Sequence, residues 1–249
     1  MDTERHPPRP EDTINLWLAS LGESARRQLE PHLREARFEQ GERLYDSGEA
    51  VTTVWFPVRG VVSLMTVLDD ERMVETAVIG REGLVGVTCG PMNGRAVSRA
   101  IAQTPGMALC ADVDSFGKVL DAHAEAREAL SRYTEALFAQ VQQTAACNAQ
   151  HKLEERFARW LLTLHDRADA DTFHLTQSDI AGMLGARRAT VSEIGSALEA
   201  KGLIERGRGK VTILDRAGLE AASCGCYAAI ASVLVELDVS PVSDTDVAA

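Results

Sequence analysis

The sequence predicts an α+β protein: an N-terminal antiparallel β-roll, a long helix, then two short helices and a β-hairpin. Three observations predict this order. Short alternating apolar segments separated by glycines dominate residues 38–110. A helical stretch without glycine or proline follows, from Ala122 to Asn148. Residues 175–214 then combine helical spacing, a glycine corner and a basic turn.

The first domain is expected at residues 14–120, after a polar, proline-containing arm at 1–13. Leucines and a tryptophan between 16 and 33 predict two short helices that cap the roll. Strands are expected at 54–56, 61–65 and 74–79, with another inside 100–110. Several short strands with turn signals between them are typical of a small antiparallel barrel or roll.

The long helix, at 121–148, carries apolar positions spaced alternately by four and three residues. This heptad pattern runs through Ala126, Leu130, Tyr133, Leu137, Gln140, Thr144 and Cys147. We expect this seam to meet its twin in a dimer, while a stripe at Phe138, Val141 and Ala145 packs on the roll. The alternative is that the seam itself packs on the roll. The dimer helix is expected to act through Leu130, Tyr133, Leu137, Val141 and Thr144.

The stretch from Leu175 to Leu214 predicts a winged helix-turn-helix. Thr176 and Asp179 have the spacing of a helix N-cap followed by an acid, and Gly185 ends the first helix. A second helix is expected at Arg187–Lys201, with Val191, Ile194 and Leu198 on its buried face. A hairpin with a basic turn at 207–210 follows. Such a shape indicates DNA binding.

The distribution of charge is compatible with that function although the net charge is −11. Residues 185–214 carry six basic and three acidic side chains, so they contribute +3 and the rest of the chain contributes −14. Phosphate contacts dominate the affinity of proteins for DNA, so the basic segment 185–214 is compatible with DNA binding. The negative charge of the rest of the chain discourages non-specific adhesion to DNA.

The order of these elements resembles that of the Crp/Fnr family of bacterial transcription regulators. The resemblance is most specific in EERFARWLLTLHD at 154–166, in 175–214 and in DRAGLEAASCGCY at 215–227. GERLYDSGE at 41–49 and FPVRGVVSL at 56–64 resemble the family's cyclic-nucleotide-binding-type roll. The resemblance implies a DNA-binding domain at 149–222, a C-terminal helix and tail at 223–249, and a homodimer on a pseudo-palindromic duplex. It also implies contact with RNA polymerase.

Family base-readers lie in the first two turns of the recognition helix, at positions that match Arg188, Ala189, Ser192 and Glu193. Arg188 can bond guanine with two hydrogen bonds, and Glu193 can accept from a cytosine amino group. Alternatively, Glu193 pairs with Arg188 or Arg187 in the free protein. The side chains expected to contact phosphates are Thr176, Gln177, Arg187, Thr190, Arg206, Arg208 and Lys210. The alternative for Arg206 and Arg208 is a solvated hairpin charge.

The expected effector pocket comprises Gly80, Glu82, Gly83, Leu84, Arg95 and Ser98. The family's cyclic-nucleotide clamp has a Gly-Glu pair and an arginine followed by a hydroxyl residue. Here Arg81 separates Gly80 from Glu82, and Ala96 follows Arg95. A phosphate clamp needs a cation and a hydroxyl together, so cyclic AMP is not expected and the effector is open.

No cofactor or metal is expected. The first cysteine is Cys89, so the N-terminal iron–sulfur cluster of the family's oxygen-sensing branch is not expected. Cys224 and Cys226 form the closest pair, but a metal site would need further ligands, and small buried side chains are the expected reading. The five cysteines show no CxxC spacing, so they also predict no disulfide framework.

The sequence contains no Walker loop, metal-protease motif or paired nucleophile and base, so we expect no enzyme. No signal peptide and no apolar run long enough to span a bilayer occur, which predicts a cytoplasmic protein without a membrane partner. The alternative function is a ligand-sensing module whose winged helix binds protein instead of DNA, because fold alone does not determine function.

Overall fold

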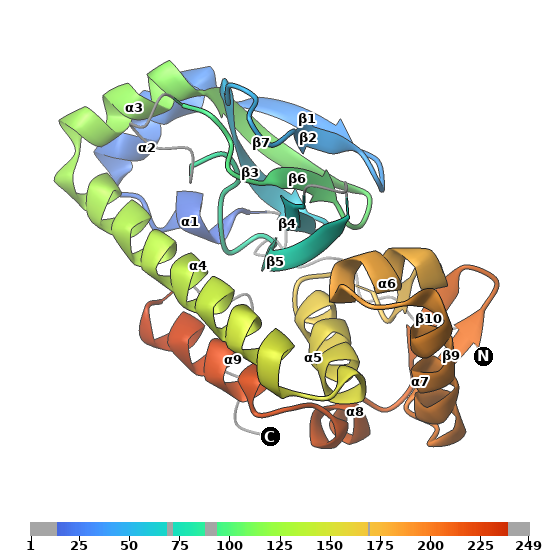
Figure 1. Ribbon diagram of the computed structural model, residues 1–249. Helices are drawn as coiled ribbons and strands as arrows, with labels where there is room; N and C mark the ends of the chain where they lie inside the picture. The colour runs from blue at the N-terminus through green and yellow to red at the C-terminus, as the bar shows by residue number, and fades with distance from the viewer. Residues whose placement is uncertain (1–13, 69–71, 88–93, 169, 239–249) are drawn as a thin grey trace, which may run out of the picture.

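The computed structural model describes residues 14–68, 72–87, 94–168 and 170–238 (Figure 1). The predicted arm at 1–13, Cys89 and the tail from residue 239 onward lie outside the described residues. The chain folds as an α+β protein with the predicted order: a roll, a long helix and a winged helix-turn-helix.

Two antiparallel sheets form the roll. One has the order β1 (Arg34–Phe38), β7 (Gly106–Asp112), β3 (Thr53–Arg59). The other has the order β2 (Arg43–Tyr45), β6 (Arg99–Ala102), β4 (Val62–Val67), β5 (Met73–Ile79). The predicted strand within 100–110 is therefore two strands, which belong to different sheets. Buried side chains of both sheets join one apolar core.

Short helices close one end of the roll: α1 (Leu16–Ala19), α2 (Glu23–Leu29), the 3₁₀ turn η2 (Glu30–His32) and α3 (Val113–Ala122). The rings of Trp17, Phe56 and Phe116 pack together with centroids 5.7–5.8 Å apart. Asn15 is buried at the start of α1, where its amide donates to the carbonyls of Pro57 and Gly83 at 2.9 and 2.8 Å. Because these bonds satisfy the amide, Asn15 fixes α1 on the sheet at little desolvation cost.

The long helix α4 (Ala124–Gln150) begins and ends within three residues of its predicted bounds. Its seam, however, faces the chain's own core. Tyr133, Leu137 and Thr144 are 4–6% exposed, whereas Phe138 is 61% exposed. The expectation for these residues was therefore wrong: the seam is buried within the chain, and Phe138, which was expected to pack on the roll, is exposed. A heptad repeat identifies an apolar stripe but does not determine which surface covers it. Leu130 and Val141 are half-buried and pack against the core of the roll.

The C-terminal half continues with α5 (Leu153–His165), β8 (Thr172–Phe173), α6 (Gln177–Leu184) and α7 (Arg188–Ala200). It ends with β9 (Ile204–Gly207), β10 (Lys210–Ile213), α8 (Arg216–Ala222) and α9 (Cys226–Glu236). A second apolar core joins α5, α6, α7, α8 and the antiparallel β8–β10–β9 sheet. Val61 and Val78 of the roll belong to this core, so the two halves share an apolar contact.

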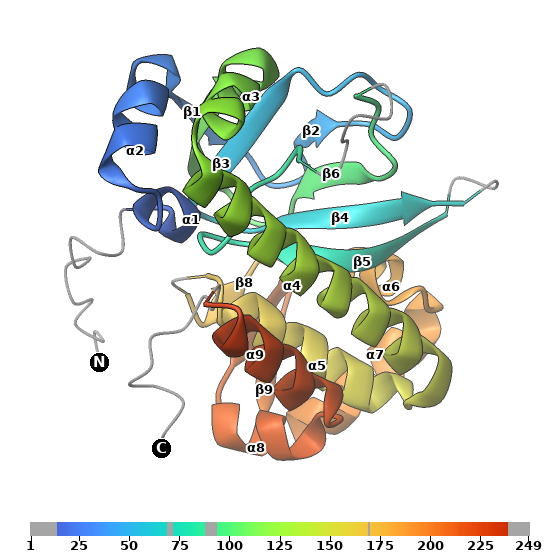
Figure 2. The same cartoon turned by 90° about the vertical axis from the view of Figure 1, so that its left-hand side faces the viewer.

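The last helix returns to the first half of the molecule. In both views α9 lies along α4 (Figures 1 and 2), and Ile230 and Leu234 join the core of the roll. Among the described residues, no single helix has the length and composition to cross a bilayer; α8 and α9 meet those criteria only as a pair bent by 108°.

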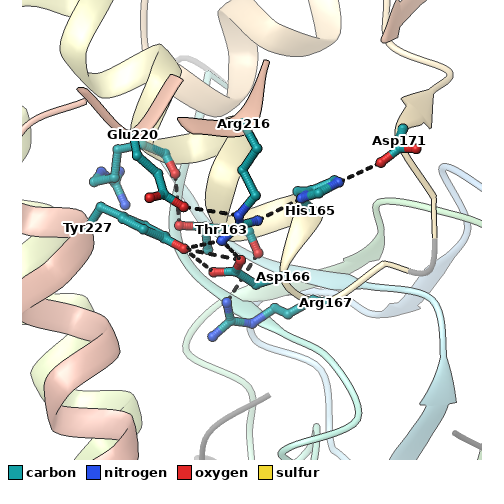
Figure 3. Close-up of polar contacts among 9 residues, drawn as sticks. Thr163, His165, Asp166, Arg167, Asp171, Arg216, Glu220 and Tyr227 are labelled. Carbon is teal, nitrogen blue, oxygen red and sulfur yellow. Dashed lines mark hydrogen bonds and ion pairs between the residues drawn. The ribbon is translucent and has the colours of Figure 1, made fainter. Parts of the chain in front are cut away.

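Polar side chains anchor α9 to α8 and to the end of α5 (Figure 3). Arg216 donates to Asp166 and to the Tyr227 hydroxyl, each at 2.7 Å, and Tyr227 donates to Asp166 at 3.0 Å. Arg216 also lies 2.7 Å from Nδ1 of His165, while Nε2 of His165 lies 2.8 Å from Asp171. Since the guanidinium only donates, Nδ1 accepts and Nε2 carries the proton.

Candidate nucleic-acid interface

The helix-turn-helix starts at a capping box. The Thr176 hydroxyl accepts from the amide of Asp179 at 3.2 Å, and the Asp179 carboxylate accepts from the amide of Thr176 at 2.8 Å. Gly185 ends α6 in the left-handed conformation, with φ +60°. These bonds satisfy the helix ends and set the corner between α6 and α7.

Helix α7 presents two faces. Val191 and Leu198 are buried and Ile194 is half-buried, as their spacing predicts. Arg188, Ala189, Thr190 and Glu193 are exposed on the other side. Within the described residues Glu193 forms no ion pair with Arg187 or Arg188, so the structure leaves this carboxylate available.

Ser192 differs from the other predicted readers because it is half-buried. The Gln177 amide lies 3.2 Å from its hydroxyl and links the start of α6 to the second turn of α7. Gln177, predicted to contact phosphate, thus also orients a predicted base reader.

Arg206 connects the wing to α7. Its guanidinium donates to the Glu199 carboxylate at 3.0 and 3.1 Å, to the Ser192 carbonyl at 3.1 Å and to the Ser196 hydroxyl at 2.7 Å. A Cβ on Gly195 would lie 2.8 Å from this guanidinium, so the absence of a side chain at Gly195 makes room for the Arg206 side chain. In the DNA-free chain Arg206 is therefore not a solvated hairpin charge, because its guanidinium donates to groups of α7.

The contacts between Arg206 and α7 also affect the ionisation of Glu199. The backbone amide and then the side chain of Arg206 donate to its carboxylate and lower its pKa, so the carboxylate stays ionised to a more acidic pH than an ordinary glutamate. Because Arg206 belongs to β9, its bonds to α7 fix the hairpin relative to the exposed face of that helix.

A groove of about 470 Å³ lies between α6, α7 and the wing. Arg188, Arg208 and Lys210 line it together with Thr176 and Gln177. Arg187 is exposed at the N-cap of α7. In the part of the chain that the structure describes, these four cations form no ion pair, whereas Lys201 pairs with Glu154 at 2.6 Å. The groove therefore presents free positive charge.

The predicted effector residues fall into two groups. Gly80, Glu82, Gly83 and Leu84 follow β5 directly. The buried Glu82 carboxylate accepts from Nε of Arg167 at 2.7 Å, and both side chains are 2–4% exposed. The Tyr133 hydroxyl donates to the carbonyl of Leu84 at 2.9 Å, and a Cβ on Gly83 would lie 2.3 Å from the Tyr133 ring. This segment is therefore clamped between α4 and the end of α5.

Arg95 and Ser98 form the second group. Arg95 donates to the carbonyl of Gly48 at 2.6 Å, while Ser98 is buried. Residues 88–93, which lie between the two groups in sequence, are outside the described residues. Arg167 was not predicted: its contact with Glu82 joins positions 85 residues apart, and no local pattern signals such a pair.

Glu75 of β5 forms a second polar link between the halves. It accepts from Nε1 of Trp160 at 2.8 Å and from the Ser63 hydroxyl at 2.6 Å. Burial raises the pKa of Glu75 from 4.5 to about 7, against the opposing effects of these hydrogen bonds and of Arg159. Between pH 4.5 and 7 the folded chain therefore binds a proton that the unfolded chain releases.

Because the folded state binds more protons in this window, stability falls as the pH rises from 4.5 to 7, by about 3 kcal/mol. Glu75→Gln copies the protonated form and is expected to remove this decrease, so its advantage over the wild type grows with pH. Urea unfolding at pH 5 and pH 8 measures the difference. An advantage of equal size at both values contradicts the assignment to Glu75.

Comparisons with known proteins agree with this architecture. The Crp-like helix-turn-helix domain matches residues 155–222, and the cyclic nucleotide-binding domain matches residues 35–123. No curated protein matches the chain.

Solved structures share the fold. FixK2 from Bradyrhizobium japonicum is 21% identical, with a TM-score of 0.66, and the match covers 77% of this chain and 98% of that chain. A Crp/Fnr-family regulator from Eubacterium rectale is 17% identical, with a TM-score of 0.68 and coverages of 85% and 99%. A CRP-family regulator from Thermus thermophilus is 24% identical, with a TM-score of 0.61 and coverages of 76% and 96%. With its cyclic-nucleotide-binding-type roll and its Crp-like helix-turn-helix, the chain belongs to the Crp/Fnr family of transcription regulators.

Proposed function

We propose that the chain is a homodimer that binds a pseudo-palindromic DNA duplex in a sequence-specific way and regulates transcription in the cytoplasm. The observation that carries this proposal is the free positive charge of the groove at α7. Arg188 is exposed on the outer face of the helix, and the nearby Arg187, Arg208 and Lys210 have no anionic partner among the described residues. An unneutralised basic groove beside an exposed helix matches a phosphate backbone beside a major groove.

Within this groove we assign base reading to Arg188, Ala189, Ser192 and Glu193. Arg188 offers two parallel donors to guanine, and Glu193 offers an acceptor to cytosine. Thr176, Gln177, Arg187, Thr190, Arg208 and Lys210 contact phosphates and set the register. Arg206 acts indirectly, because its bonds to Glu199 and Ser196 hold the wing in place.

Selection of bound duplexes from a random library tests the proposal. A dimer with two winged helix-turn-helix domains is expected to select two inverted half-sites whose centres lie about one helical turn (34 Å) apart. A library that yields no enriched motif at any salt concentration contradicts sequence-specific binding. Partner binding that is insensitive to salt would favour the alternative, in which the winged helix binds a protein.

The dimer forms through the exposed face of α4 in this proposal. Phe138 is 61% exposed there, and the half-buried Val141 follows it three residues later on the same side of the helix. The half-buried Leu130 lies two turns earlier, and both Leu130 and Val141 also contact the core of the roll. Large exposed apolar side chains that share a stripe with other apolar side chains mark an association surface. A second copy of α4 would cover this stripe and position two α7 helices on one duplex.

Phe138→Glu is expected to convert the dimer into a monomer. The change removes about 1.5–3 kcal/mol of apolar burial per protomer and brings two carboxylates together, so the dimer dissociation constant rises at least ~100-fold. Analytical ultracentrifugation measures it. Arg132→Glu is the control, because this exposed residue lies about 120° from Phe138 around the helix. A variant Phe138→Glu with unchanged dimer mass excludes the α4 interface.

The roll binds an effector other than cyclic AMP in this proposal, or none. Arg95 donates to a backbone carbonyl, the following residue is the buried Ala96, and the Glu82 carboxylate is committed to Arg167. These contacts support the incomplete clamp that the sequence predicts. Titration calorimetry with cyclic AMP is expected to detect no saturable binding.

A further inference from the structure

Four metal-ligating side chains meet at one point outside the groove. Cys147 lies in the last turn of α4, and His151 is the residue at which α4 ends. Cys224 lies between α8 and α9, and Cys226 begins α9. Their ligand atoms all lie within 4.8 Å of one another.

The distances within this cluster suit tetrahedral coordination. Sγ of Cys147 lies 3.5 Å from Sγ of Cys224, and Sγ of Cys226 lies 3.4 Å from Nδ1 of His151. For Zn–S bonds of 2.3 Å and Zn–N bonds of 2.0–2.1 Å, the edges of a tetrahedron are about 3.8 Å between sulfurs and about 3.6 Å between sulfur and nitrogen. The cluster needs only small movements to reach this geometry.

The surroundings favour a thiolate-bound cation. The three sulfurs form a small cluster of buried residues of their own. The Gln143 amide donates to Sγ of Cys226 at 2.9 Å, a bond of the kind that orients metal ligands from outside. Three thiolates, a neutral imidazole and a divalent ion together carry a charge of −1.

Two arginines of α5 supply the complementary charge. Arg156 and Arg159 interact electrostatically with the cysteine cluster, and Arg159 is 6% exposed. Among the described residues neither forms an ion pair with a carboxylate, and the Nε atom of each has no hydrogen-bond partner. Arg156 also donates to the carbonyl of Leu184, and Arg159 also interacts electrostatically with the Glu75 carboxylate. A buried cation is costly unless it has an anionic partner, and a metal–thiolate cluster of charge −1 would provide one.

We propose that Cys147, His151, Cys224 and Cys226 form a closed Cys₃His site for a divalent metal ion of the zinc class. Sulfur and imidazole ligands in a tetrahedral arrangement select Zn²⁺ over the oxygen-binding Mg²⁺ and Ca²⁺. Four protein ligands leave no open position, so the site is structural and not catalytic.

The ion would join two bends of the chain. Only His151 and Lys152 separate α4 from α5, so this bend connects the roll and its long helix to the DNA-binding half. The other bend, of 108°, lies between α8 and α9. Coordination would fix α9 and the α4–α5 bend together, and thereby the placement of α7 relative to α4.

Metal analysis of the full-length chain, purified under reducing conditions without chelator, tests the site. We expect one zinc per chain. After removal of zinc, Co²⁺ should bind with the intense visible bands of tetrahedral coordination and a thiolate-to-cobalt charge-transfer band. Cys226→Ser should weaken that band and lower the zinc affinity at least tenfold. Cys110→Ser, which alters a thiol outside the cluster, should change neither.

His151→Gln serves as a second variant, because His151 is the least buried ligand and its replacement leaves the buried cysteines in place. It should also lower zinc affinity at least tenfold while circular dichroism stays unchanged. A reduced, folded chain that takes up neither Zn²⁺ nor Co²⁺ overturns the proposal. Equal uptake by wild type and both variants overturns it too, as does a Cys147–Cys224 disulfide that persists under reducing conditions with metal present.

Discussion

Replacing Arg188 with alanine is expected to lower the affinity for the selected duplex by about 5- to 150-fold for each half-site. A good bidentate contact to guanine contributes about 1–3 kcal/mol of discrimination, and the dimer makes it twice. The variant should also lose its preference at one base pair in each half-site. Competition binding with single-base variants of the duplex measures both effects.

Lys210→Ala is the matched control for this prediction, because both side chains line the same groove and carry the same charge. Loss of a phosphate contact should weaken binding to all duplexes alike and reduce the salt dependence by about one unit per contact. If Arg188→Ala behaves as Lys210→Ala does, with every base preference retained, Arg188 is a phosphate contact and not a reader.

Arg167→Ala is expected to destabilise the fold by about 3–5 kcal/mol. It leaves the Glu82 carboxylate buried and without its cation, and an unpaired buried charge costs far more than a lost surface contact. Urea unfolding measures the loss. The isosteric pair Glu82→Gln with Arg167→Met should recover most of it, since no buried charge remains.

The exposed pair Arg37–Glu35, with atoms 3.7 Å apart, provides the control for that prediction. Arg37→Ala should change stability by less than about 1 kcal/mol. A similarly small effect of Arg167→Ala would mean that the Glu82 carboxylate finds another partner or water.

Local signals predicted the helix-turn-helix within one residue. The recognition helix was expected at Arg187–Lys201 and begins at Arg188 and ends at Ala200, with Arg187 as its N-cap. The capping pair Thr176–Asp179 and the corner at Gly185 lie within a few residues of what they determine, so their spacing is visible in the chain itself.

Contacts between distant residues could not be predicted in this way. Arg206 and Arg208 look alike in the sequence, yet only Arg206 meets Glu199 and Ser196, because the hairpin folds back on α7. Gly195 of α7 leaves the space that the Arg206 guanidinium occupies, but a glycine in a helix does not by itself indicate such a contact. No local sequence pattern indicated that Glu82 and Arg167 would form a buried ion pair.

The long helix and the cysteines have the same explanation. The repeat through Tyr133 and Leu137 predicts an apolar stripe, but the roll and α9 together cover it and leave Phe138 outside. Cys224 and Cys226 lacked further ligands in the sequence because Cys147 and His151 lie more than seventy residues earlier. Only the return of α9 to α4 brings the four together.

Affinity as a function of salt tests the central claim, sequence-specific DNA binding through the α7 groove, most directly. Arg187, Arg208 and Lys210 give six phosphate contacts in a dimer, so the logarithm of the association constant should fall with a slope of about −5 against the logarithm of salt concentration. The selected duplex should bind at least ~1,000-fold more tightly than a scrambled one at physiological salt. A slope near zero, or equal affinity for the two duplexes, contradicts the account.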